Sequence, residues 1–355
     1  MWRIQLPTSR WIIIEIVTFM QLFWLGIRFR ERIRNVDVIN FHIAYPSLVF
    51  WKLLKPLFRR PVVITEHWSG YHFNFGVCRP LRRIMGIFSH NIPVIAVSQA
   101  LGNDIRNFAG RDFPLYVIPN VVSDCFSPQA RVVKEPFFFM VSQWKTPKDP
   151  LPLLSAFKQF NSGRGNAYKL YVGGYGPLYH EMQHWKLTND DTGSIVFLGK
   201  LTDEEIADRM NRCVAFLHPT NYETFSVVCA EAVSCGAFVI APKVGGIPEV
   251  VGASGMLLDS WNEEDWTDAL DEFVMMERSD QPVSMPFSAS VIGGLYKKVL
   301  DEIVSIRAYS HKCTHNAPQA QKYSSNLPRT LGTYFCFETS LCHSSRKTRK
   351  PSLLP

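Results

Sequence analysis

The sequence predicts an α/β protein in which two parallel, doubly wound sheets follow one another, with a disordered tail at the C-terminal end. Three observations lead to this prediction. Short apolar strand-like runs alternate with helical patterns, a polar stretch with Pro128 and Pro136 interrupts the alternation, and periodicity stops near Arg307. Strands that alternate with helices are typical of parallel sheets covered by helices. With 355 residues, the chain is long enough for two such domains.

The domain boundaries follow these changes of pattern. We expect a partial N-terminal Rossmann-like domain over 1–125, a linker over 126–136, a C-terminal domain over 137–285, a terminal helix over 286–306 and a disordered basic tail over 307–355. The tail is rich in Ser, Thr, His, Lys and Pro, a composition that buries too little apolar surface to fold.

Within each domain the elements can be placed in order. In the first domain, strands are expected at 36–42, 61–67, 93–98 and 114–120, and helices at 48–57 and 99–108. In the second domain, strands are expected at 137–142, 168–174, 194–199, 214–220 and 237–242. Helices should separate these strands, at 150–160, 177–186, 203–210 and 226–235.

Charge and cysteine content narrow the class of protein. The formal net charge is +7, but the tail beyond residue 306 carries eight basic side chains and one acid, so it accounts for the whole excess. The rest of the chain is balanced, and we expect no nucleic-acid partner. The eight cysteines include no Cys-x-x-Cys pair. This pattern favours a reducing, cytoplasmic compartment, with Cys229 and Cys235 as small core residues.

One apolar segment raises the question of a membrane. Residues 11–27 read "WIIIEIVTFMQLFWLGI". The favoured interpretation is a buried helix. A helix lying on a charged membrane surface is a second interpretation, because Arg28, Arg30, Arg32 and Arg34 follow it. A membrane span is the third, although the segment is short and contains Glu15 and Gln21. No cleavage site of a signal peptide follows it.

Two acids mark the candidate site. Glu223 lies in the loop after the strand at 214–220, where ligands of parallel sheets bind. Glu231 is the only charge on the apolar helix "SVVCAEAVSCG", so its carboxylate must meet hydrogen-bond donors. Those donors could be a structural Arg or Lys, or the vicinal hydroxyls of a bound sugar.

The backbone around these acids suits an anion. Thr224 or Ser226 can cap the helix, and the free amides near Phe225 and Ser226 can receive a phosphate. Gly245 and Gly246 allow a close backbone approach. Pro248 and Glu249 resemble an ordinary first helical turn, for which we expect a structural role.

The segment "NYETFSVVCAEAVSCGAFVIAPKVGGIPEVV" resembles the signature of glycosyltransferase family 4 (group 1), and Glu223 and Glu231 match its two glutamates. The resemblance extends to "FMVSQWKTPKDPLPLLSAF", "LYVGGYGPL", "VFLGKL" and "VAFLHPT", and more weakly to "DVINFHIAYP", "VVITEH", "AVSQAL" and "VIPNVVSDCFSP". It covers residues 37–305. It implies a GT-B fold, with two Rossmann-like domains that face a cleft, and a retaining transfer from a nucleotide-sugar donor.

The resemblance also implies roles for individual residues. Glu223 and His67 are expected at the reacting sugar, and Glu231 at the ribose hydroxyls of the donor. The rest of the implied donor site consists of Lys145, Lys148, Gly174, Thr224, Phe225 and Ser226. No metal site and no cofactor are expected, because no Asp-x-Asp element stands at a strand end. His42 and His218 are expected to pack or cap at strand ends.

The implied partners are a nucleotide-sugar donor (UDP- or GDP-linked), a glycan or lipid-linked acceptor in cell-surface polysaccharide synthesis, and the inner membrane surface if the helix at 11–27 docks there. Two departures favour an alternative. Gln143 stands where the family carries Arg, and the usual Gly-rich opening is absent, so the chain is expected to begin inside its N-terminal domain. The alternative is a truncated, non-catalytic remnant that binds a nucleotide-sugar or a protein partner only.

Overall fold

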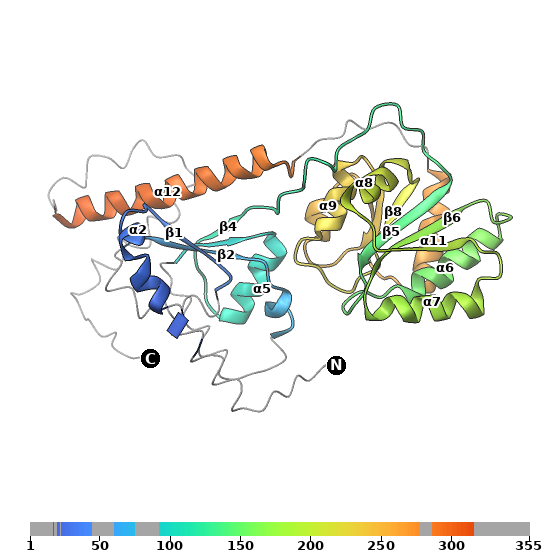
Figure 1. Cartoon of the computed structure of the whole chain (residues 1–355), viewed down its shortest axis with the longest axis horizontal. Coiled ribbons are helices and arrows are strands. Elements are labelled where there is room, and N and C mark those ends of the chain that lie inside the picture. The colour runs from blue at the N-terminus through green and yellow to red at the C-terminus, as the bar shows by residue number, and fades with distance from the viewer. Residues whose placement is uncertain are drawn as a thin grey trace, which may run out of the picture. The chain divides into compact units, whose positions relative to one another are not determined.

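The computed structural model describes residues 17, 20, 21, 23–44, 60–74, 92–276 and 286–315. The chain divides into two compact units, Met1–Glu302 and Ile303–Pro355. Both sheets belong to the first unit (Figure 1).

The N-terminal sheet has four parallel strands in the order β1-β2-β3-β4. These strands are β1 (Ile39–His42), β2 (Val62–Glu66), β3 (Val94–Ala96) and β4 (Leu115–Val117). The short helices α2 (Arg30–Arg34) and η1 (Ser69–Tyr71) precede β1 and follow β2. Between β3 and β4 runs α5 (Gln99–Ala109). It begins where the Ser98 side chain accepts from the Leu101 amide, and it ends at Gly110, whose φ of 62° is left-handed.

The C-terminal sheet has six parallel strands in the order β10-β9-β8-β5-β6-β7. These strands are β5 (Phe137–Gln143), β6 (Lys169–Tyr175), β7 (Ile195–Gly199), β8 (Ala215–Leu217), β9 (Val239–Pro242) and β10 (Gly255–Leu258). From β5 the chain first builds outward through β6 and β7, then returns to the other side of β5 with β8. The strand order therefore reverses between β5 and β8. In open parallel sheets, ligands bind beyond the carboxyl ends of the two strands at such a reversal.

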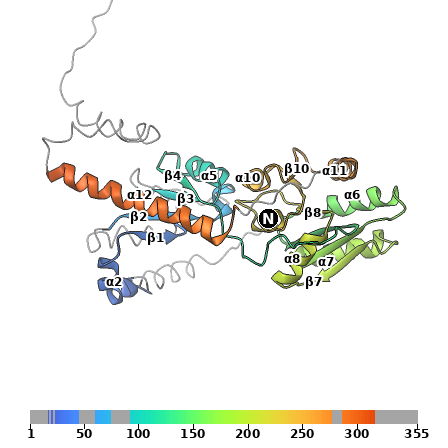
Figure 2. The ribbon, with the colours of Figure 1, turned by 90° about the horizontal axis from the view of Figure 1, so that it is seen from above.

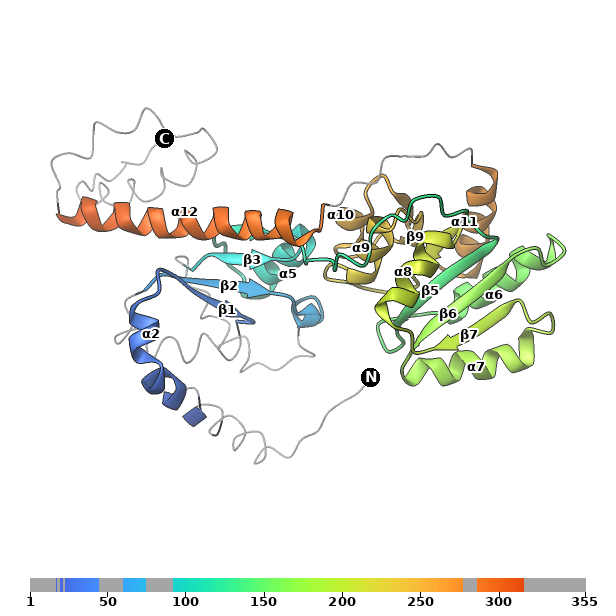
Figure 3. The same cartoon turned by 45° about the horizontal axis from the view of Figure 1, so that its top comes forward.

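Helices cover both faces of this sheet. One apolar cluster joins it to α6 (Leu151–Ser162), α7 (Pro177–Asn189) and α11 (Glu263–Met275). The other cluster joins it to α8 (Asp203–Arg212), α9 (Val227–Ser234) and α10 (Ile247–Val251). Figure 2 shows α6 and α11 on one side of the sheet and α8 on the other, and Figure 3 shows the strands between them.

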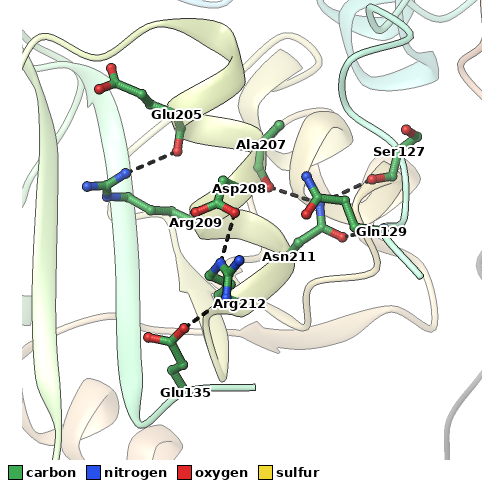
Figure 4. Close-up of polar contacts among 9 residues, drawn as sticks. All are labelled: Ser127, Gln129, Glu135, Glu205, Ala207, Asp208, Arg209, Asn211 and Arg212. Carbon is green, nitrogen blue, oxygen red and sulfur yellow. Dashed lines mark hydrogen bonds and ion pairs between the residues drawn. The ribbon is translucent and has the colours of Figure 1, made fainter. Parts of the chain in front are cut away.

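Side chains in the last turn of α8 bind the polar segment before β5 (Figure 4). The Asn211 amide donates to the carbonyl oxygens of Ser127 (3.1 Å) and Ala207 (2.9 Å), and its oxygen accepts from the Gln129 amide (2.8 Å). Arg212 contacts Glu135 (3.1 Å) and Asp208 (2.8 Å). The stretch expected to be a linker is thus without regular structure but anchored.

The structure confirms a strand within each of the nine stretches where one was predicted, and helices at 99–108, 150–160, 177–186, 203–210 and 226–235. The helix expected at 48–57 lies outside the described residues. Helix α10 confirms the helical turn expected at Pro248 and Glu249, whereas β10 and α11 were not predicted. The terminal helix α12 (Ala289–His315) continues past residue 306, so the prediction of disorder from residue 307 was wrong for its first nine residues. No proline interrupts the chain between 307 and 315, which lets the helix continue.

The favoured burial of the helix at 11–27 is contradicted over its described part. Residues 23–28 are helical, and Met20 and Trp24 keep 64% and 61% of their surface exposed. Only Gly26 is buried among the described residues of this segment. Apolar composition alone led to the wrong expectation, since no described element packs on this face. In the part of the chain that the structure describes, no helix has the length and apolarity to span a membrane.

Candidate functional site

The loops after β5 and β8 are joined beyond the carboxyl ends of these strands. The Asn221 amide donates to the Pro147 carbonyl (2.9 Å), and the Asp149 amide donates to the Pro219 carbonyl (3.3 Å). Lys148 and Thr220 form an isolated antiparallel bridge. The two loops therefore place their side chains at the reversal of strand order, where a ligand site is expected.

Glu223 lies at the centre of this group. Its Oε1 accepts from Lys148 Nζ in a short ion pair and from His218 Nε2 at 3.2 Å. Lys148 Nζ also lies 3.4 Å from Thr220 Oγ1. Burial would raise the pKa of Glu223, but the hydrogen bonds and charges of His218 and Lys148 outweigh it and bring the pKa to about 2. The carboxylate is therefore ionised throughout the neutral range.

His218 belongs to the site, contrary to the expectation that it only packs or caps. Its side chain is 1% exposed at the end of β8. Burial lowers the pKa of His218, while the hydrogen bond with Glu223 opposes that change. A neutral imidazole must donate from Nε2, because an ionised carboxylate only accepts. The cation that compensates Glu223 near pH 7 is thus Lys148. His218 and Glu223 both follow β8 and are five residues apart, and this spacing could have indicated the contact.

Glu231 lies on α9 and forms no ion pair with any described residue. Among the residues that the structure describes, no Arg, Lys or other donor is bonded to its carboxylate. Burial and the charge of Asp203 raise the pKa of Glu231 to about 7. Two kinds of partner were considered for this acid: an internal Arg or Lys, and the hydroxyls of a bound sugar. The first is therefore ruled out among the described residues.

The start of α9 has unused amides. Ser226 caps the helix in a left-handed conformation (φ 71°, ψ 80°) without a side-chain hydrogen bond to the backbone. Such strain in a residue other than glycine is typical of functional sites. The amides of Phe225 and Ser226 make no hydrogen bond with any described residue. The Phe225 ring packs edge-on against Phe287, so only the backbone of Phe225 is available to a ligand.

Glycines let the surrounding backbone come close. A Cβ on Gly245 would lie 1.9 Å from the Glu223 carbonyl oxygen, and one on Gly246 would lie 2.3 Å from that of Thr224. Gly174, at the end of β6, has a φ of 107°, and its Cβ would meet the Ser142 carbonyl at 2.0 Å. The need for glycine at these three positions comes from contacts within the chain itself.

The remaining expected site residues are not bonded to the Glu223 group. Gln143 is exposed at the end of β5 and Lys145 is exposed in the loop after it, five and three residues before Lys148. His67 follows β2 and stacks on His42, with ring centroids 5.8 Å apart. Burial and the charge of His42 lower the pKa of His67, against a hydrogen bond with Asn120. Within the described chain no cluster of three or more His, Cys, Asp or Glu could hold a metal ion.

The geometry offers two kinds of recognition. An unpartnered carboxylate suits a pair of neighbouring hydroxyls, and free helix-start amides near a lysine suit a phosphate. A nucleotide carrying a ribose and a diphosphate presents both groups.

In comparisons with known proteins, both halves of the chain match glycosyltransferase families. Residues 124–284 match the family described as glycosyl transferases group 1, and residues 7–124 match the one described as glycosyltransferase family 4. The D-inositol 3-phosphate glycosyltransferase of Corynebacterium jeikeium is 32% identical over 276 residues, which cover 69% of this chain and 66% of that protein.

Two further matches are informative. The phosphatidylinositol N-acetylglucosaminyltransferase gpi3 subunit of Schizosaccharomyces pombe is 29% identical over 145 residues, covering 39% of this chain and 32% of the subunit. The chain thus spans 66% of the Corynebacterium enzyme and 32% of the gpi3 subunit. A crystal structure of Anabaena HepE in complex with UDP superposes with a TM-score of 0.66 at 20% identity, covering 80% of this chain and 83% of HepE. The fold is therefore that of GT-B glycosyltransferases, as the sequence predicted.

Proposed function

Since this chain belongs to the group 1, family 4 glycosyltransferases, we propose that it transfers a sugar from a nucleoside diphosphate donor to an acceptor hydroxyl. The observation that carries this proposal is Glu231. Its carboxylate has no partner among the described residues, and its pKa is raised to about 7 by burial and Asp203. A half-buried acid without donors is unfavourable, and ribose hydroxyls would supply two donors at once.

In the proposed reaction, the bond between the anomeric carbon and the diphosphate oxygen breaks, and its electron pair stays on the diphosphate. Lys148 and the amides of Phe225 and Ser226 would stabilise that charge, so the reaction needs no metal. The acceptor hydroxyl forms the new bond on the face that the diphosphate leaves, and its proton passes to the leaving group. The anomeric configuration is then retained. Glu223, held by His218, would fix the donor sugar, and His67 would face it from the N-terminal sheet.

The donor and acceptor classes rest on relatives. HepE was crystallised with UDP, and one relative is an O-antigen chain mannosyltransferase from Escherichia coli. Others are named for inositol 3-phosphate and phosphatidylinositol. These names support a UDP- or GDP-sugar donor and a glycan or lipid-linked acceptor in cell-surface polysaccharide synthesis.

The test is to incubate the full chain with UDP- and GDP-sugars and candidate acceptors, and to measure release of the nucleoside diphosphate. We expect release from one donor and its loss in Glu231→Ala. Product NMR then reports the anomeric configuration. Binding of UDP or GDP in calorimetry without turnover would instead support the non-catalytic alternative, which Gln143 motivates. Full activity of Glu231→Ala would refute the proposed role of this acid.

A membrane surface is the proposed location, on the cytoplasmic side. Met20, Phe23, Trp24 and Ile27 follow helical spacing, and all four are exposed. Exposed arginines at 28, 30, 32 and 34 come next, as in helices that lie on anionic lipid. The chain should co-sediment with anionic vesicles at low salt and not with neutral ones. Trp24→Ser should weaken this association, whereas Leu187→Ser, at an 83% exposed position of α7, should not.

A further inference from the structure

The segment that carries Glu223 is bonded to the start of α5. Ser98 Oγ donates to the Thr224 carbonyl oxygen (2.5 Å) and accepts from the Leu101 amide (3.0 Å). The same hydroxyl thus caps α5 and binds the residue next to Glu223. All residues involved lie in the compact unit Met1–Glu302.

Glu249 joins a second segment to the same helix start. Its Oε2 accepts from the Gln99 amide (2.7 Å) and its Oε1 from the Ala100 amide (2.9 Å). Both amides belong to the first turn of α5, where intrahelical partners are missing and negative charge is favourable. The turn before Glu249 returns to the site, because the Gly246 amide donates to the Glu223 carbonyl oxygen (2.9 Å).

Tyr222 supplies a third link to the N-terminal half. Its hydroxyl donates to Asp104 of α5 in a short hydrogen bond, and its ring stacks on His72 with centroids 3.7 Å apart. The Tyr222 side chain is buried, with 4% of the residue exposed. Together, Ser98, Asp104, Tyr222 and Glu249 form what we call the α5 clamp around residues 222–224.

We propose that Glu249 and Asp104 are positioning residues for Glu223. The clamp fixes the backbone of residues 222–224, and thereby sets where the Glu223 carboxylate lies between Lys148 and His218. Glu249 was expected to have a structural role, and its two hydrogen bonds go to residues 150 and 149 positions earlier in the chain. This inference deepens the proposed function and rests on it for the effect on turnover.

The reason to expect a large effect is geometric. Displacements of about 1 Å at a reacting centre can cost about 100-fold in rate. Glu249→Gln keeps the shape of the side chain but replaces one acceptor oxygen by an NH₂ group that faces an amide. It therefore breaks one of the two bonds to α5 and removes the charge. Tyr222→Phe removes only the bond to Asp104.

The matched control is Asp265→Asn. Asp265 also accepts a backbone amide at a helix start, that of Asn262 at 2.9 Å, but on α11. Asp265→Asn likewise replaces a carboxylate by an amide, but at a residue outside the α5 clamp. Two measurements are made on all variants: hydrogen exchange of the Gly246 amide, which donates to the Glu223 carbonyl oxygen, and turnover with the donor that the wild type uses.

We expect the Gly246 amide to exchange faster in Glu249→Gln and Tyr222→Phe, and both variants to lower kcat by about tenfold or more. The Kd of the nucleoside diphosphate and the Tm should change no more than in Asp265→Asn. Unchanged exchange of the Gly246 amide would overturn the clamp, whether or not the wild type is active. Faster exchange with kcat at the control value would overturn the positioning role. An inactive wild type would count against the proposed function alone, and the clamp would then be judged by exchange.

Discussion

Lys148 and Glu223 form an ion pair between the loops that follow β5 and β8, the two strands at which the strand order reverses. Both side chains are largely buried, at 11% and 21% exposure. The pair therefore depends on two segments that are 75 residues apart in the chain. The pair places the charge of Lys148 at the carboxyl ends of the strands, where a diphosphate would compete with Glu223 for this charge.

Replacing this cation should destabilise the protein. In Lys148→Met, Glu223 stays largely buried without a compensating charge, and we expect a loss of about 2 kcal/mol in the free energy of unfolding at pH 7. Urea unfolding measures this loss. Lys145→Met is the control, because Lys145 is exposed in the same loop. Equal effects of the two substitutions would contradict a structural role for the pair.

The same ion pair determines how the stability of the protein changes at low pH. The pKa of Glu223 is lowered from 4.5 to about 2, so its contribution to stability is complete above pH 4.5 and lost as the pH falls through 2. Glu223→Gln should therefore flatten the dependence of Tm on pH between about 5 and 2. Thermal unfolding over this range tests the prediction. A variant that follows the wild-type curve would show that the carboxylate is not specially stabilised.

Glu231 should have the opposite effect from Glu223 on the pH dependence of stability. Its pKa is raised from 4.5 to about 7, so the folded state binds a proton that the unfolded state releases. Wild-type stability should thus fall as the pH rises from 4.5 to 7. Glu231→Gln should be the more stable protein at pH 8, by up to about 3 kcal/mol. Equal stability of the two proteins at pH 8 would argue against an unpaired, half-buried carboxylate.

Ligand binding should release a proton from Glu231. Ribose hydroxyls are donors, so they favour the ionised carboxylate and lower its pKa. We expect the Kd of UDP or GDP to decrease as the pH rises towards 7. Calorimetry at pH 6 in buffers of different ionisation enthalpy should detect proton release, which Glu231→Gln should lack. Proton uptake, or release that persists in the variant, would place the titrating group elsewhere.

The anchor of the segment before β5 should contribute to stability through Asn211. This side chain makes three hydrogen bonds and the residue is 5% exposed. Asn211→Ala should cost about 2 kcal/mol in urea unfolding, because buried partners lose their bonds. Arg212→Ala removes exposed ion pairs and should cost under about 1 kcal/mol. A reversed order of the two costs would contradict this account of the anchor.

Much of the fold could be predicted from local pattern. Strand β9, which is buried along its whole length, reads as a continuous apolar run, and the alternation with helices indicated a parallel arrangement. Helix α11 was not predicted, although Asn262 and Asp265 form a capping box at its start. The helix around Trp24 was expected to be buried. An apolar composition does not specify a partner, and none of the described elements covers its exposed face.

The site could be predicted in part. Glu231 stood out because a lone charge on an apolar helix must be satisfied, and the structure leaves it unpartnered within the described chain. The contacts of His218 with Glu223, of Tyr222 with Asp104 and of Glu249 with α5 were not predicted. The last two join residues more than 100 positions apart, and neither spacing nor composition encodes which surfaces meet.

The most direct measurement is calorimetry of UDP and of 2′,3′-dideoxy-UDP with the wild type and Glu231→Gln at pH 8, with GDP and its analogue if UDP does not bind. We expect loss of the ligand hydroxyls to weaken binding about tenfold or more in the wild type, because hydrogen bonds to a charged acceptor are lost. In Glu231→Gln the same loss should be much smaller. If the hydroxyls matter equally in both proteins, ribose is not bound by Glu231, and the central claim is wrong.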